Sequence, residues 1–194
     1  MSETQATPAM ALGGAACDGL ISIREAAPQA MIALRGDLAS SEIKNAATSV
    51  TGLDMPGPRG ANWVGDRAIL WMSPDELLIL CPYDEADSAL AGMAGCLDGR
   101  HALVTDMSDA RSSFDLRGAG LRDVLAKLTP ADMSRTGLPV GELRRSRLAQ
   151  TPAAFWLKSE TSAQIICFRS VAQYVFDLLK TAAQPGSAVA FFDR

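Results

Sequence analysis

Residues 67–80 read RAILWMSPDELLIL and contain two apolar runs separated by a short polar segment. Arg67–Met72 and Glu76–Leu80 have the length and apolar content typical of strands. Ser73-Pro74-Asp75 between them consists of residues that favour turns. The stretch therefore predicts a β-hairpin.

The segments on both sides of this hairpin each predict a helix and a strand. Upstream, Met31–Leu34 reads as a strand, and either Ser40 or Ser41 can cap the helix that follows. Downstream, Asp84 can cap a second helix, and His101–Asp106 returns as a strand. The order β-α-β-β-α-β is the split βαβ pattern of ferredoxin-like sheets. The apolar positions with helical spacing are Ile43, Ala46, Ala47 and Val50 in the first helix and Ala86, Leu90, Met93 and Leu97 in the second.

Thr51–Gly65 separates the first helix from the hairpin and holds two prolines and four glycines. This composition predicts a loop. Trp63 is its only large aromatic residue.

The second half of the chain predicts similar elements. Its strands are expected at Ser112–Leu116, Leu143–Ala149, Ala153–Leu157 and Gln164–Phe168. A helical stripe follows the first of these strands, and Ser170 with Gln173 suggests a capping box for a last helix. The stripe consists of Leu121, Val124, Leu125 and Leu128.

A repeated Leu-Arg-Gly motif relates the two halves. Leu34-Arg35-Gly36 and Leu116-Arg117-Gly118 each end a strand before a helix, about eighty residues apart. We therefore expect an α+β fold of two duplicated split βαβ halves, at about residues 21–107 and 108–194. Together they would form one domain, 21–194, after a flexible tail at residues 1–20.

The composition excludes several classes of protein. The 194 residues carry a net charge of -4, which opposes binding to nucleic acid or to an anionic membrane. No stretch approaches the about 18–20 apolar residues of a membrane span. Cys17, Cys81, Cys96 and Cys167 lack the spacing of a metal site, so reduced thiols and a cytoplasmic location are expected.

Groups for independent chemistry are few. His101 is the only histidine, so a histidine base or a serine–histidine triad would have to use it. Gly118-Ala119-Gly120 resembles the start of a dinucleotide fingerprint, but Asp123 stands where a third small residue is required. We therefore expect no catalytic, cofactor or metal site in this chain.

Asp106, Asp109 and Asp115 allow two interpretations. Paired carboxylates can act as acid and base. Aspartate also stabilises turns by accepting bonds from its own backbone, and this interpretation is favoured here.

Arg144-Arg145-Ser146-Arg147 is the densest positive run, and Phe155-Trp156 follows it closely. Strand alternation would place Arg145 and Arg147 on the same face as Leu143. Arginine is enriched at protein interfaces, and a solvated strand is the equally open alternative for the arginines. Large aromatics anchor either a core or an interface. The residues expected to contact a partner are Trp63, Arg145, Arg147, Phe155 and Trp156.

Four stretches carry a resemblance to a known family. They are residues 71–80 (WMSPDELLIL), 104–118 (VTDMSDARSSFDLRG), 125–133 (LAKLTPADM) and 144–156 (RRSRLAQTPAAFW). The chain is similar in these stretches to the gamma subunit of heterotetrameric sarcosine oxidase, over roughly residues 20–180. More distantly, it resembles the folate-binding domain of glycine-cleavage aminomethyltransferases.

This resemblance implies a small structural and assembly subunit that is not catalytic on its own. The alpha and beta subunits, with a delta subunit, would complete the enzyme and hold FAD, FMN, NAD and tetrahydrofolate. The complex would demethylate sarcosine to glycine, with hydrogen peroxide and either formaldehyde or 5,10-methylenetetrahydrofolate as products. The alternative is a free-standing folate-binding protein of the aminomethyltransferase-like superfamily.

Overall fold

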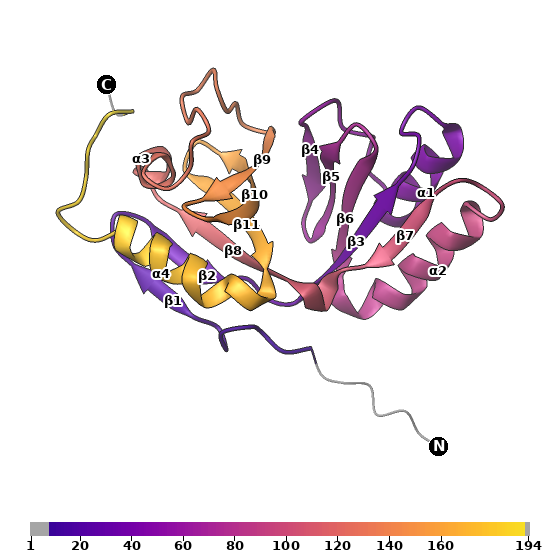
Figure 1. The fold of residues 1–194 in the computed structure, drawn as a ribbon, viewed down its shortest axis with the longest axis horizontal. Helices are drawn as coiled ribbons and strands as arrows, with labels where there is room; N and C mark the ends of the chain where they lie inside the picture. Colours follow the sequence, from indigo (N-terminus) through magenta and orange to yellow (C-terminus); the bar gives the residue numbers. More distant parts are fainter. Residues whose placement is uncertain (1–7, 193–194) are drawn as a thin grey trace.

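The structure, a computed structural model, describes residues 8–192 as two halves that face each other across a central junction (Figure 1). Each half contains one antiparallel sheet, and helices pack on its outer face. The layers therefore run helix, sheet, sheet, helix, which confirms the expected α+β class. None of the helices within residues 8–192 is long and apolar enough to cross a membrane.

The first sheet has the strand order β4-β5-β6-β3-β7. The predicted hairpin is confirmed as β5 and β6, with Leu70 opposite Leu78. The first helix begins at the predicted cap, where the Ser40 hydroxyl oxygen accepts the N–H of Ile43 at 3.2 Å. The elements are β3 (Gln29–Arg35), α1 (Ser41–Thr51), β4 (Ala61–Val64), β5 (Arg67–Ser73), β6 (Glu76–Pro82), the 3-10 turn η1 (Tyr83–Glu85), α2 (Ala86–Cys96) and β7 (Leu103–Asp106).

Two local predictions for this half were wrong, and one predicted strand begins later than expected. The end of the predicted loop forms β4, because Trp63 pairs with Ala68 of β5. Asp84 does not cap α2, since it lies in η1, which leads directly into the helix. The strand predicted at His101–Asp106 is confirmed as β7, but it begins two residues later, because a tight turn closed by the Ala102 N–H and the Arg100 carbonyl at 2.9 Å precedes it.

The second sheet has the order β1-β2-β8-β11-β10-β9. All four strands predicted for the second half are confirmed, within two residues at each end. The helical stripe forms a short helix that ends before Leu128. The elements are β1 (Ala16–Asp18), β2 (Ser22–Glu25), the turn η2 (Ser108–Ala110), β8 (Arg111–Arg117), α3 (Leu121–Ala126), β9 (Leu143–Leu148), β10 (Thr151–Ser159), β11 (Ser162–Phe168), the turn η3 (Arg169–Val171) and α4 (Ala172–Ala182).

The predicted capping box before α4 was wrong. Ser170 lies in η3, and the residue that precedes α4 is Val171, whose side chain makes no capping bond. Gln173 instead donates from Nε2 to the Asp177 carboxylate one turn later, at 3.1 Å. The 3-10 turn thus starts the helix without a side-chain cap.

The N-terminal segment corrects both the expected tail and the expected boundary between the halves. Residues 1–7 lie outside the described residues, but Ala16–Asp18 forms β1 and pairs with β2. Strand β2 pairs in turn with β8, so it belongs to the second sheet although it precedes the first sheet in the chain (Figure 1). The buried Glu25 carboxylate holds the segment by accepting the N–H groups of Leu12 and Gly14 at 2.9 and 2.8 Å.

The placement of β2 in the second sheet completes the duplicated architecture. The orders β4-β5-β6-β3-β7 and β9-β10-β11-β8-β2 correspond strand for strand. In the first half, β7 follows α2 and pairs antiparallel with β3. In the second half, the described chain after α4 forms no strand, and β2 fills the corresponding place beside β8.

Gly36 and Gly118, the glycines of the repeated Leu-Arg-Gly motif, occupy equivalent positions at the ends of β3 and β8. Gly36 has φ 158° and Gly118 has φ 150°, a backbone conformation that side chains disfavour. A Cβ atom added to Gly118 would lie 2.8 Å from Cγ2 of Ile21, just before β2. Close approach of the exchanged segment therefore requires glycine here.

We expect Gly118→Ala to lower the free energy of unfolding by about 3 kcal/mol, because it adds both backbone strain and overpacking. The matched control is Gly92→Ala on the exposed side of α2, where nothing lies within 4 Å of the new methyl group. That change should stabilise the protein by up to about 1 kcal/mol. Urea unfolding of both variants measures the difference, and equal stabilities would contradict the close approach of Ile21.

Candidate functional site

The junction between the two sheets is the main structural feature that both halves build together. Its apolar centre contains Trp156, the largest fully buried side chain of this layer. Two backbone hydrogen bonds connect the beginnings of β4 and β9 across it. The Ala61 N–H donates to the Gly141 carbonyl at 2.8 Å, and the Leu143 N–H donates to the Arg59 carbonyl at 2.7 Å. Its buried members are Met31, Ala61, Ala68, Leu70, Met72, Leu78, Leu80, Leu143, Ala154, Trp156 and Ile166.

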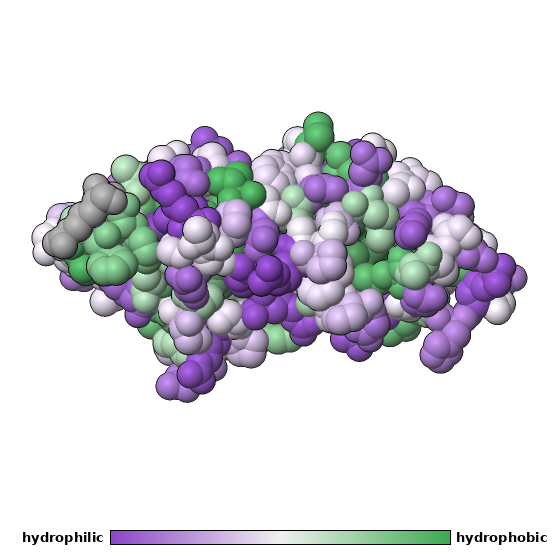
Figure 2. All heavy atoms as spheres, turned by 90° about the horizontal axis from the view of Figure 1, so that it is seen from above, coloured by the Kyte–Doolittle hydropathy of each residue, from purple (hydrophilic) through white to green (hydrophobic). Residues whose placement is uncertain are grey.

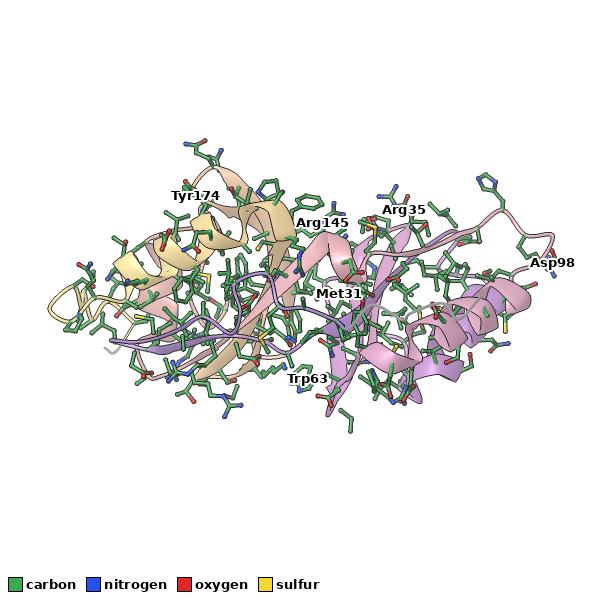
Figure 3. All side chains as sticks on the ribbon, turned by 90° about the horizontal axis from the view of Figure 1, so that it is seen from below. Met31, Arg35, Trp63, Asp98, Arg145 and Tyr174 are labelled. Atoms are coloured by element: carbon green, nitrogen blue, oxygen red, sulfur yellow. The ribbon has the colours of Figure 1, made fainter. Side chains whose placement is uncertain are left out.

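The junction opens to solvent on two opposite sides. Figure 3 shows Trp63 on one side of the junction and Arg145 on the other. On the face seen in Figure 2, hydrophilic residues gather along the junction, while hydrophobic residues form separate patches on each half. The two openings differ in the side chains that line them.

The opening beside Trp63 is a cleft of about 780 Å³, here called the acidic cleft. Both halves line it. The lining contains six aspartates but only two cationic side chains, Arg67 and Lys158. Its polar and aromatic lining residues are Gln29, Trp63, Asp66, Arg67, Tyr83, Asp84, Asp87, Asp106, Asp109, Asp115, Trp156, Lys158 and Gln164.

Three of these residues form a row across neighbouring strands. Trp156 of β10 lies opposite Gln164 of β11, and Gln164 lies opposite Asp115 of β8. Gln164 is 5% exposed, and the Trp156 Nε1 atom is buried without a hydrogen-bond partner among the described residues. Lys158 places its Nζ 5.9 Å from the centre of the Trp156 ring. Burial lowers the pKa of this ammonium group, and the charge of Asp115 opposes the shift.

The aspartates between β7 and β8 are partly engaged within the protein. The Asp106 carboxylate accepts the N–H of Ser108 at 2.8 Å, which confirms the turn interpretation for this residue. Asp109 accepts a hydrogen bond from the Tyr83 hydroxyl at 3.1 Å. Burial raises the pKa of that hydroxyl, and the bond to Asp109 raises it further. Asp109 therefore links the two halves at the edge of the cleft.

The opposite opening is a smaller groove of about 90 Å³, here called the arginine groove, which Met72, Arg111, Arg145, Cys167 and Phe168 help to line. The nearly buried Glu76 carboxylate accepts from Arg35 at 2.8 Å and from Arg145 at 3.2 Å. Arg111 lies nearby, and its Nε is buried without a partner among the described residues. Burial lowers the pKa of its guanidinium group, and the Glu76 charge opposes this shift.

The predicted partner-contact residues separate into three groups. Trp63 lines the acidic cleft, and Arg145 lines the arginine groove. Arg147 is exposed on the edge strand β9, on the same face as Arg145, as the alternation predicted. Phe155 and Trp156 are fully buried, which confirms the core alternative and corrects their inclusion among the partner-contact residues. Strand β10 is flanked by β9 and β11 and covered on both faces, which removes these rings from the surface.

The remaining candidate residues are His101, Asp123 and the four cysteines. His101 is exposed in the turn before β7. Asp123, the residue that spoils the glycine motif, is buried and accepts the N–H of Phe191 at 3.2 Å, so it holds the C-terminal segment. The four cysteines are free thiols. No group of three or more potential metal ligands occurs within residues 8–192.

Sequence reasoning missed the polar floor of the acidic cleft, formed by Gln164 and Lys158. Gln164 interrupts the apolar run Ala163–Cys167 of β11, which is a signal of a buried polar role. Its position opposite Trp156 depends on the pairing register, which no sequence pattern revealed.

The thiol reactivity of the folded chain tests the arginine groove. Burial raises the pKa of Cys167 to about 12 and raises that of Cys81, whereas Cys96 is exposed. We expect Cys96 to react rapidly with a disulfide reagent near neutral pH, and Cys81 and Cys167 to react only after denaturation. Thiol titration in buffer and in urea, with peptide mapping, measures this. Rapid labelling of native Cys167 would contradict the buried floor of the groove.

Comparisons with known proteins agree with this architecture. The model of the sarcosine oxidase, gamma subunit family matches residues 35–185. A sarcosine oxidase subunit gamma from Corynebacterium sp. (strain U-96) is 29% identical over 182 residues, which cover 93% of this chain and 87% of the relative. One from Arthrobacter sp is 32% identical over 160 residues, which cover 81% of this chain and 76% of that relative.

Comparison with solved structures also gives a match to a sarcosine oxidase. A chain of the heterotetrameric sarcosine oxidase from Corynebacterium sp. U-96, in complex with pyrrole 2-carboxylate, matches with a TM-score of 0.76 and 27% identity. The match covers 84% of this chain and 83% of that chain. The glycine cleavage system aminomethyltransferase T from Bartonella henselae shares the fold, with a TM-score of 0.61 at 12% identity, over 83% of this chain and 46% of that one. The chain therefore belongs to the sarcosine oxidase gamma subunit family.

Proposed function

We propose that this chain is the small, non-catalytic assembly subunit of a heterotetrameric sarcosine oxidase. The observation that carries the proposal is the match of residues 35–185 to the gamma subunit family, together with the TM-score of 0.76 to a chain of such a heterotetramer. The complete enzyme would demethylate sarcosine to glycine, with hydrogen peroxide and a one-carbon unit as the other products.

The partners proposed are the alpha, beta and delta subunits. FAD, FMN, NAD and tetrahydrofolate would be bound by these partners rather than by this chain. The one-carbon unit would leave as 5,10-methylenetetrahydrofolate or as formaldehyde. We further propose a cytoplasmic location, supported by four free thiols, two of which are buried in the cores.

The surface proposed to contact partners includes Trp63, Arg145 and Arg147. Arg147 is the cleanest of the three to test, because it is exposed and lies on an edge strand. Arg145 is less suitable, since its bond to Glu76 also stabilises the subunit itself. Arginine at such a position forms bidentate contacts with carboxylates, which favours an acidic partner surface.

Co-expression of this chain with the other three subunits tests the assembly proposal. We expect an affinity tag on this chain to recover the alpha, beta and delta subunits in equal amounts. The isolated chain should bind neither flavin nor tetrahydrofolate in calorimetry, because the cofactors are proposed to lie in the partners. Tight folate binding by the isolated chain, or failure to recover the partners, would refute the proposal.

Charge reversal tests the role of the edge strand. We expect Arg147→Glu to weaken assembly at least tenfold, which corresponds to about 1.4 kcal/mol. The matched control is Lys44→Glu on the exposed side of α1, which should leave assembly unchanged. Affinity is measured by titrating the variant chains into the three co-purified partners. Equal affinities for the two variants would remove Arg147 from the interface.

A further inference from the structure

The guanidinium group of Arg111 makes no hydrogen bond within residues 8–192, although Arg111 is half-buried at the start of β8. The nearby Glu76 carboxylate acts on it through its charge alone. Burial lowers the pKa of this group, the Glu76 charge opposes the shift, and the charge of Arg145 adds to it. Buried charges in proteins are normally paired, so a partly desolvated arginine without an acceptor indicates a missing anion.

The register of the second sheet places Arg111 and Arg145 on one face, at the open side of the junction. Phe168 lies directly opposite Arg111 and two residues after Ile166, which belongs to the junction core. Arg145 lies opposite Ala154, another member of that core. Alternate residues of a strand share a face, so Phe168, Arg111 and Arg145 all lie on the junction side of the sheet. All three line the arginine groove.

The arginine groove combines an apolar floor with cationic edges. The floor includes the buried Met72 and Ile166, and Phe168 is 47% exposed beside Arg111. The cavity of about 90 Å³ is well below the about 300–1,000 Å³ typical of cofactor and small-molecule sites. Its size therefore favours the side chain of a docked segment over a cofactor.

The charges around the groove favour an anionic occupant. Arg35 and Arg145, which lie together on one side of the junction in Figure 3, both donate to the same oxygen of Glu76. The exposed Asp75 adds one negative charge near these two arginines. With Arg111, three cations face two carboxylates, and the arginine without a hydrogen bond is the one left over. A guanidinium group can donate two parallel hydrogen bonds to one carboxylate.

We propose that the arginine groove receives an acidic segment of a partner subunit. An aspartate or glutamate carboxylate of this segment accepts hydrogen bonds from Arg111 and lies beside Arg145, while an adjacent apolar side chain packs on Phe168. Arg147 belongs to the same contact, because it lies two residues after Arg145 on the same face of β9. The inference rests on the proposed assembly function and names the chemistry of one of its contacts.

The variant Arg111→Met separates this role from a structural one. Methionine keeps the apolar packing of the arginine stem and removes a partly desolvated cation. We therefore expect the isolated variant to unfold in urea at the same concentration as the wild-type chain or at a higher one. Its binding to the three co-purified partners should be at least tenfold weaker, because the partner carboxylate loses its donor. A purely structural role predicts the opposite pattern, with lower stability and unchanged affinity of the folded chain.

The matched control is Arg117→Met, which makes the same substitution at the other, exposed end of β8. It should bind the partners like the wild-type chain. Arg111→Lys keeps the charge but loses the paired donors, so its affinity should lie between those of Arg111→Met and the wild type. Wild-type affinity of Arg111→Met, or equal weakening by Arg111→Met and Arg117→Met, would overturn the groove proposal and leave the assembly proposal intact. Failure of the wild-type chain itself to bind would instead refute the assembly proposal.

A photoreactive side chain in the groove identifies the occupant directly. Benzoylphenylalanine replaces the exposed Phe168, and the assembled complex is irradiated and mapped by mass spectrometry. We expect a cross-link to a partner subunit, at a peptide that carries an aspartate or glutamate within a few residues of the linked position. A cross-linked peptide without an acidic residue, or an assembled complex that gives no cross-link to a partner, would overturn the groove proposal.

Discussion

The pairing of β2 with β8 is the contact on which the arrangement of the two halves depends. Without β2, strand β8 would expose one row of backbone donors and acceptors along its edge, and such edges promote aggregation. The same contact places Ile21 and Ile23 in the core of the second half. Only three residues, 26–28, then separate β2 from β3 of the first sheet. This short connection keeps the two sheets adjacent and limits how they can face each other.

The junction follows from that constraint. Two sheets held close together must cover their inner faces, and Trp156 with ten other apolar residues does so. Charged groups are then excluded from the centre and gather at its margins. On one side, the carboxylate of Glu76 is shared by Arg35 and Arg145, so removal of this one group would leave two cations without compensation. On the other side, aspartates predominate, which gives the junction two faces of opposite chemical character.

Much of the fold could be predicted from local patterns, because those patterns are local in origin. The β5–β6 hairpin and the Ser40 cap depend on residues a few positions apart. Strand β4 was missed because four residues between glycines carry little periodicity, and its pairing with β5 stabilises it. The exchange of β2 depends on contacts with residues some ninety positions away, which a scan of neighbouring residues does not detect. The choice between core and interface for Phe155 and Trp156 stayed open for the same reason, since burial of both faces of β10 is a property of the assembled sheets.

The exchanged strand also determines the order in which the chain can fold as it is synthesised. The first sheet has all its strands once residue 106 has left the ribosome. Strands β1 and β2, although made earlier, can pair only with each other until β8 has emerged, and the rest of their sheet is made later still. Domains generally fold as units during synthesis, and long-range pairing is slow. Strands β1 and β2 are therefore among the last of the described strands to be fixed in place, although they precede the first sheet in the chain.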